Sequence, residues 1–154
     1  MNFNWSKYLT PDESLQMEFS VSNSFRTGII IASIIISVIL LFTNILVALV
    51  VLLLGLLDWF YLKKAKHYAF TNKRIILIES FIGESIVSID YNQITDIEIN
   101  QSAFDQIGGW GTLTINTAGT HVPEVNLSFI NDPQRIKQKL DQIRDSVKTS
   151  NSAT

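Results

Sequence analysis

A long apolar block divides the chain into two more polar parts. Across Thr27–Leu62 the only charged side chain is Asp58. A single helix over this block would be about 54 Å long, whereas the hydrocarbon core of a bilayer is about 30 Å thick. Thr43 and Asn44 form the only adjacent polar pair inside the block, and both residue types favour turns. The pattern therefore predicts a hairpin of two membrane-spanning helices, Phe25–Phe42 and Ile45–Leu62.

Two alternatives to a full crossing remain open. The block could form a buried hairpin in a soluble protein, although apolar stretches of this length rarely fit a soluble core of this size. It could also form a re-entrant pair that does not cross fully. Asp58 lies one turn from the end of the second span, and an intramembrane carboxylate is a candidate for transport or proton transfer. A position near the interface, where it reaches water or a lysine, explains Asp58 better.

Basic residues flank the block on both sides, while the turn between the two spans carries no charge. Arg26 precedes the block, and three lysines follow it: Lys63, Lys64 and Lys66. The positive-inside rule places both of these ends in the cytoplasm. We therefore expect a multi-pass protein of the cell membrane, with both termini and any folded domain on the cytoplasmic side.

Short stretches rich in β-forming residues follow the apolar block, and turn-forming residues separate them. These stretches predict six strands: His67–Thr71, Arg74–Ser80, Ser85–Tyr91, Ile94–Asn100, Trp110–Thr117 and Val122–Phe129. In the last stretch Val125, Leu127 and Phe129 alternate with polar residues. Ser14–Val21, before the block, alternates apolar and polar residues with the same period of two. Because both flanks of the hairpin lie on one side, we expect this stretch to join the same sheet as a seventh strand.

A C-terminal helix completes the predicted domain. Asp132 is a good N-cap and Pro133 fits the first helical position. The apolar residues that follow share one helical face: Ile136, Leu140, Ile143 and Val147. The sequence thus predicts an α+β protein with a two-helix transmembrane hairpin, a barrel or sandwich of about seven strands, and a C-terminal amphipathic helix. The expected divisions are a cytoplasmic segment with one strand (1–24), the hairpin (25–62), the β domain with its helix (63–148) and a disordered tail (149–154).

Several motifs resemble the bacterial PH domain of YdbS-like membrane proteins. The most specific is Tyr68-Ala69-Phe70-Thr71-Asn72-Lys73-Arg74-Ile75-Ile76-Leu77. The others are Leu9-Thr10-Pro11-Asp12-Glu13, Tyr91-Asn92-Gln93-Ile94 with Ile97, Gly108-Gly109-Trp110-Gly111-Thr112, and Asp132-Pro133. The resemblance extends over nearly the whole chain, including the hairpin, and implies that the β domain is PH-like.

Composition and motifs give no indication of catalysis. The net charge is −2, without the basic excess of a nucleic-acid binder. The absence of cysteine excludes disulfides, thiolate metal sites and cysteine nucleophiles. The two histidines, His67 and His121, have no metal-binding spacing, and the glycines at Gly108–Gly111 lack the Lys-Ser/Thr of a phosphate loop. We therefore expect no catalytic residues, no cofactor, no metal and no enzymatic activity.

Two kinds of function remain for a binding module held at a membrane. The first is a scaffold, adaptor or accessory subunit that contacts a membrane protein partner or a second copy of itself. Small residues available for helix packing are Gly28, Ala32, Ser33 and Gly55. The alternative is a sensor of membrane lipid headgroups through a basic patch, with the candidates Lys63, Lys64, Lys66, Lys73 and Arg74. An enzyme or transporter would be a different class, and no motif supports it.

Overall fold

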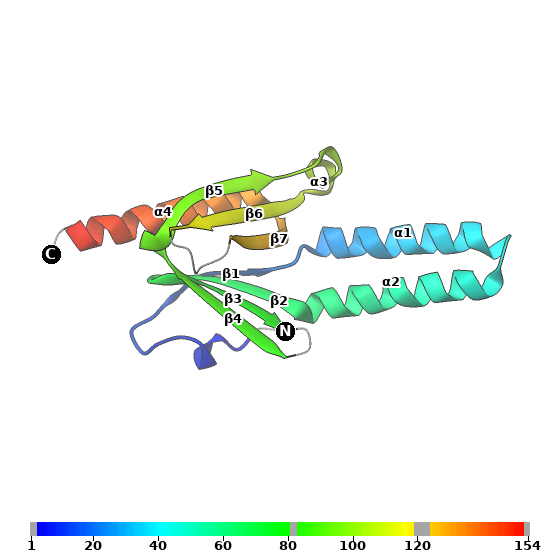
Figure 1. Ribbon diagram of the computed structural model, residues 1–154, viewed down its shortest axis with the longest axis horizontal. Coiled ribbons are helices and arrows are strands. Elements are labelled where there is room, and N and C mark those ends of the chain that lie inside the picture. The colour runs from blue at the N-terminus through cyan, green and yellow to red at the C-terminus, as the bar shows by residue number, and fades with distance from the viewer. Residues whose placement is uncertain (1–2, 81–82, 119–123, 153–154) are drawn as a thin grey trace.

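Two antiparallel helices project from one end of a β-rich domain (Figure 1). The structure is a computed structural model that describes residues 3–80, 83–118 and 124–152, without the side chains of residues 63–65 and 150–152. The helices are α1 (Asn23–Leu41) and α2 (Ile45–Ala65), and both are long and apolar enough to cross a membrane. The Asn44 side chain accepts hydrogen bonds from the amides of Leu46 and Val47, so the predicted turn residue caps α2.

A narrow seam of small residues joins the two helices. Ser37 Oγ donates a hydrogen bond to the Ala48 carbonyl at 2.8 Å, and both residues are buried. A Cβ atom at Gly55 would lie only 2.2 Å from Ser33 Oγ, so the glycine is required for this close approach. Apart from this seam the hairpin surface is apolar and exposed, since only 17% and 11% of the residues in the two apolar windows are buried.

Seven strands form two antiparallel sheets, which confirms the predicted fold class. The first sheet has the order β1-β2-β3-β4, with strands Leu15–Ser20, Lys66–Thr71, Arg74–Ser80 and Glu84–Asp90. The second has the order β5-β6-β7, with strands Ile94–Asn100, Trp110–Thr117 and Val125–Asn131. A short 3-10 turn, η2 (Tyr91–Gln93), connects the sheets. The strand that precedes the hairpin therefore lies beside the strand that follows it.

The main core lies between the sheets, where α4 (Pro133–Ser152) closes it. Ile136, Leu140 and Ile143 of the predicted apolar face are buried there. Asp132 Oδ1 accepts the Arg135 amide at 3.2 Å, as expected for the N-cap. The helix extends to Ser152, so residues 149–152, which the sequence suggested as a disordered tail, are helical; residues 153–154 lie outside the described residues.

The N-terminal segment forms a second core on the outer face of the first sheet. This segment contains a 3-10 turn, η1 (Trp5–Lys7), and Trp5 is buried against Ala69, Ile76 and Ile78. The indole Nε1 of Trp5 donates to the Glu18 carboxylate at 2.6 Å. Strands β2 and β3 are therefore covered on both faces, which explains their nearly continuous apolar runs.

A bulge in β7 corrects the predicted side-chain alternation of that strand. The register shifts so that Gly111 pairs with Ile130 and Leu113 with Leu127, which leaves two β7 residues opposite one on β6. Phe129 takes a positive φ of 54°. Because of this bulge Ile130 points into the core, whereas Phe129, expected to alternate inward with Leu127, is 39% exposed. Residues 122–123 of the predicted strand lie outside the described residues.

The bulge also attaches the hairpin to the domain. The Ser22 amide donates to the Phe129 carbonyl at 2.7 Å, and Val21 forms a single bridge with Ile130. The Phe25 ring, at the start of α1, stacks on the Phe129 ring with centroids 3.9 Å apart. A short helix, α3 (Ala103–Gly108), lies near this junction and has no counterpart in the sequence prediction (Figure 1).

Candidate binding groove

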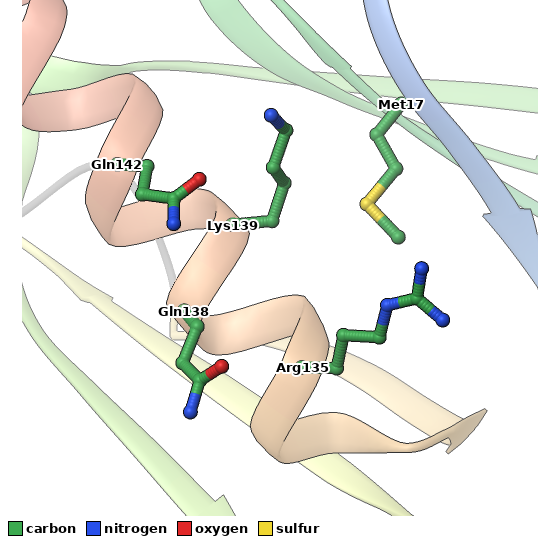
Figure 2. Close-up of a pocket in the computed structure, with 5 residues that line it drawn as sticks. All are labelled: Met17, Arg135, Gln138, Lys139 and Gln142. Atoms are coloured by element: carbon green, nitrogen blue, oxygen red, sulfur yellow. The ribbon is translucent and has the colours of Figure 1, made fainter.

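An open groove runs between the edge of β1 and one face of α4 (Figure 2). Its volume is about 460 Å³, which is within the range of small binding sites. The residues that line it are Met17, Arg135, Gln138, Lys139 and Gln142. In Figure 2 the Arg135 and Lys139 side chains extend from the helix toward Met17 on the strand.

Helical periodicity places the polar residues of the groove on one stripe of α4. The positions 135, 138, 139 and 142 follow the spacing of a single helix face, next to the buried face at Ile136, Leu140 and Ile143. Two of the five lining side chains are cations and none is an acid. Within the described residues, neither Arg135 nor Lys139 forms an ion pair. The groove is therefore electropositive.

The strand side of the groove is an unpaired sheet edge. β1 pairs with β2 along one edge only. Among the described residues, the other edge meets β7 only next to α1, through the Val21–Ile130 bridge. Backbone amides and carbonyls along Leu15–Ser20 are thus positioned to pair with another extended chain. A positive helix face and an open strand edge form the two walls of one groove.

The predicted basic patch is not a single surface. β2 runs away from the hairpin and spans about 20 Å from Lys66 to Thr71, so Lys73 lies at the opposite end of the domain. Lys66 Nζ pairs with Glu79 Oε1 at 2.9 Å. The backbones of Lys63 and Lys64 lie in α2, but their side chains are outside the described ones.

Arg74, the fifth candidate of the patch, belongs to a structural network. Its Nε donates to Glu13 Oε1 at 3.0 Å, and the Glu13 side chain is fully buried. Thr71 Oγ1 donates to the same carboxylate at 2.7 Å, and the Thr10 amide donates at 3.1 Å. Burial opposes the charge of Glu13, but these hydrogen bonds prevail and lower its pKa to about 2. Arg74 therefore fixes the N-terminal segment to the β2–β3 turn.

The four predicted packing residues occupy three different environments. Ser33 and Gly55 contact each other inside the hairpin seam. Gly28 faces the domain, because a Cβ atom there would lie 3.7 Å from Cη2 of Trp110. Ala32 is exposed on the outside of α1. Of the four, Ala32 is the one whose surface is open to a partner helix.

The described part of the chain offers no metal cluster. No group of three or more histidine, cysteine, aspartate or glutamate residues there could hold a metal ion. His67 lies on β2 with its ring stacked 4.2 Å from that of Phe3, and burial lowers the pKa of its imidazole. His121 lies outside the described residues.

The sequence prediction missed the groove, although its helix signal was present. Arg135 and Lys139 are four residues apart and stand on one face of a helix that the sequence predicts. The missing information was the position of β1, which the chain connects to the other strands only through the hairpin. Without that position, no pattern indicates which element faces the basic stripe of α4.

Two antiparallel sheets of four and three strands, closed by a C-terminal helix, make this domain PH-like. A family model described as "Bacterial PH domain" matches residues 25–144. The chain therefore belongs to the bacterial PH domain family, and the match includes most of α1 and all of α2. Membership of the narrower YdbS-like group stays a prediction.

Solved structures resemble this chain at low sequence identity. One is the pleckstrin homology domain from Shewanella amazonensis SB2B, which is 16% identical, with a TM-score of 0.52 and coverage of 91% of each chain. Another is a DUF1696 family protein with a pleckstrin-homology domain from Shewanella loihica PV-4, also 16% identical, with a TM-score of 0.49 and coverage of 91% of this chain and 89% of that chain. No curated protein matches the chain.

Proposed function

We propose that this protein is a membrane-anchored binding module that acts without chemistry of its own, as a scaffold, adaptor or accessory subunit of a membrane protein complex. In this proposal the groove between β1 and α4 binds an extended, acidic segment of a protein partner. The observation that carries the proposal is the unpaired β1 edge facing the Arg135–Lys139 stripe of α4. Strand addition would supply backbone hydrogen bonds, while the two cations would select acidic side chains.

The exposed apolar surface of the hairpin supports the membrane anchor. Side chains such as Ile39, Phe42 and Leu46 are 62%, 90% and 70% exposed. An apolar surface of this extent would favour aggregation in water, whereas a bilayer accommodates it. Basic residues at the domain end of the hairpin, Arg26 and Lys66 among them, favour a cytoplasmic domain. Anchoring would raise the effective concentration of the groove toward other membrane proteins.

The lipid-sensor alternative has weaker support. It requires Lys63, Lys64, Lys66, Lys73 and Arg74 to face one membrane surface. Lys66 and Arg74 are paired with acids, and Lys73 lies in the β2–β3 turn, at the end of β2 opposite to the hairpin. We therefore favour a protein partner over a specific headgroup.

Photo-crosslinking in cells tests the groove. A photoreactive amino acid at Gln138, in the full-length chain, should form an adduct with a protein partner. Arg135→Gln combined with Lys139→Gln should strongly reduce the yield of this adduct, because it removes both cations from the groove. The matched control is Lys137→Gln with Lys148→Gln, which removes the same charge from α4 outside the groove and should leave the yield unchanged.

Mass spectrometry of the adduct supplies the second criterion. The cross-linked peptide of the partner should be acidic and predicted to be extended. An adduct whose yield is the same in the groove variant and the control variant would refute the proposed groove, and so would an adduct that maps to a basic segment. All variants are first checked for equal amounts in the membrane fraction.

A further inference from the structure

The short helix α3 presents two large apolar side chains to the outside of the domain. Phe104 is 81% exposed and Ile107 is 87% exposed, more than nearly all the large apolar residues of the hairpin. The two residues are three positions apart and therefore share one helix face. Neither side chain contributes to either of the two hydrophobic cores. The folding of the domain does not account for this exposed pair.

Local hydrogen bonds hold α3 in a fixed orientation. Ser102 and Asp105 form a reciprocal capping box at its start, and Gly109 ends it with a φ of 72° in the left-handed region. Asp105 Oδ1 also accepts the indole Nε1 of Trp110 at 2.7 Å, which joins the helix to the first residue of β6. The orientation of the exposed face of α3 is therefore fixed relative to β6.

Trp110 in turn places α3 beside the start of α1. Its ring lies 5.6 Å from that of Phe25, and a Cβ atom at Gly28 would lie 3.7 Å from its Cη2. Figure 1 shows α3 at the end of the domain from which the hairpin projects. Arg26 is the last charged residue of α1 before its apolar run. If α1 spans the bilayer, this level corresponds to the membrane–water interface, where tryptophan is enriched.

We propose that α3 is an interfacial membrane-docking element whose Phe104 and Ile107 side chains insert among the lipid acyl chains next to α1. This inference rests on the membrane anchor of the proposed function. Trp110 holds α3 beside the start of α1, at the level where α1 would enter the bilayer and where the exposed apolar surface of the hairpin begins. Insertion would attach the second sheet to the bilayer beside the hairpin and so restrict rotation of the domain about the anchor. A bilayer fits the exposed pair because short amphipathic elements bury their apolar face at this depth.

Site-specific fluorescence in the full-length chain tests the docking element. Because the native chain has no cysteine, single cysteines introduced by Phe104→Cys or Ile107→Cys take one environment-sensitive label each. Each variant keeps the other apolar residue. The labelled proteins are reconstituted into phosphatidylcholine–phosphatidylglycerol vesicles with and without doxyl-labelled lipids. We expect blue-shifted emission at both positions and loss of emission when the doxyl lipids are present.

Two control positions separate this inference from the proposed function. Leu53 lies on the exposed surface of α2. A label on Leu53→Cys should be strongly quenched if the hairpin spans the bilayer. Lys73 lies in the β2–β3 turn, away from the hairpin, and a label on Lys73→Cys should be neither shifted nor quenched. A quenched label at Leu53 with unquenched labels at Phe104 and Ile107 would overturn the docking element alone.

The other outcomes are equally decisive. An unquenched label at Leu53 would overturn both the membrane anchor and the docking element. Blue-shifted labels at Phe104 and Ile107 that the doxyl lipids do not quench would mean that protein covers α3, against this inference. Quenching at Lys73 as strong as at Phe104 would mean that the domain lies on its side, which would also contradict insertion through α3.

Discussion

At the residue scale, a single carboxylate holds the N-terminal segment on the sheet. The fully buried side chain of Glu13 accepts hydrogen bonds from Arg74, Thr71 and the Thr10 amide. The sequence placed Glu13 in a motif shared with the family but assigned it no partner. It assigned Arg74 to lipid instead, because a basic residue in a hairpin next to a lysine carries the same signal whether it faces water or an acid. The identity of its partner depends on contacts more than fifty residues apart.

The lowered pKa of Glu13 predicts acid sensitivity. Its pKa falls from 4.5 to about 2 in the folded state. The resulting stabilisation, about 3 kcal/mol, is fully present above pH 4.5 and is lost as the pH falls toward 2. Glu13→Gln should lower the free energy of unfolding at pH 7 by about 2–3 kcal/mol and flatten its pH dependence over this interval. Urea unfolding in detergent, followed by tryptophan fluorescence, measures both quantities.

Glu98→Gln is the matched control for this prediction. Glu98 is exposed on β5, so its replacement should leave the free energy of unfolding at pH 7 within about 0.5 kcal/mol of the wild type. If Glu13→Gln behaves like Glu98→Gln, the buried network does not stabilise the domain.

At the scale of elements, the sequence predicted long regular segments well and short ones poorly. β3, β5 and β6 have the predicted boundaries, because each is a stretch of seven or eight mostly β-forming residues between turn-forming residues. α3 has only six residues, too few for a helical period, although the Ser102-to-Asp105 capping box was a readable signal. The groove depends on the distance between β1 and α4, and no local pattern encodes that distance.

The hairpin seam gives the prediction at this scale. Gly55→Ala places a methyl group within 2.2 Å of Ser33 Oγ, so the two helices must separate. The cost should be about 1–3 kcal/mol, seen as a lower thermal midpoint of the helical circular dichroism signal in detergent. Ala32→Leu, on the exposed face of α1, adds more volume but should leave the midpoint of the purified protein unchanged. Equal midpoints for Gly55→Ala and the wild type would contradict this close packing.

At the scale of the whole molecule, the proposed anchor predicts a definite topology. With both termini in the cytoplasm, a cysteine introduced by Thr43→Cys, in the turn between the helices, should react with an impermeant maleimide added to intact cells. A cysteine introduced by Ser146→Cys, on α4, should react only after the membrane is permeabilised. Labelling of Ser146→Cys in intact cells would show that the topology is opposite to the proposed one. Protection of both positions would favour a re-entrant hairpin.

The pairing of β1 with β2 has a consequence for biogenesis. These two strands are neighbours in the sheet, yet the entire hairpin separates them along the chain. If the hairpin crosses the membrane twice, β1 leaves the ribosome first and stays unpaired until both spans have been inserted and β2 has been synthesised. A chain that inserted only one span would leave β1 and β2 on opposite sides of the bilayer, where no sheet could form. The domain could then fold only in chains whose two spans are both inserted. Wrongly inserted chains would expose unpaired strands to proteolysis.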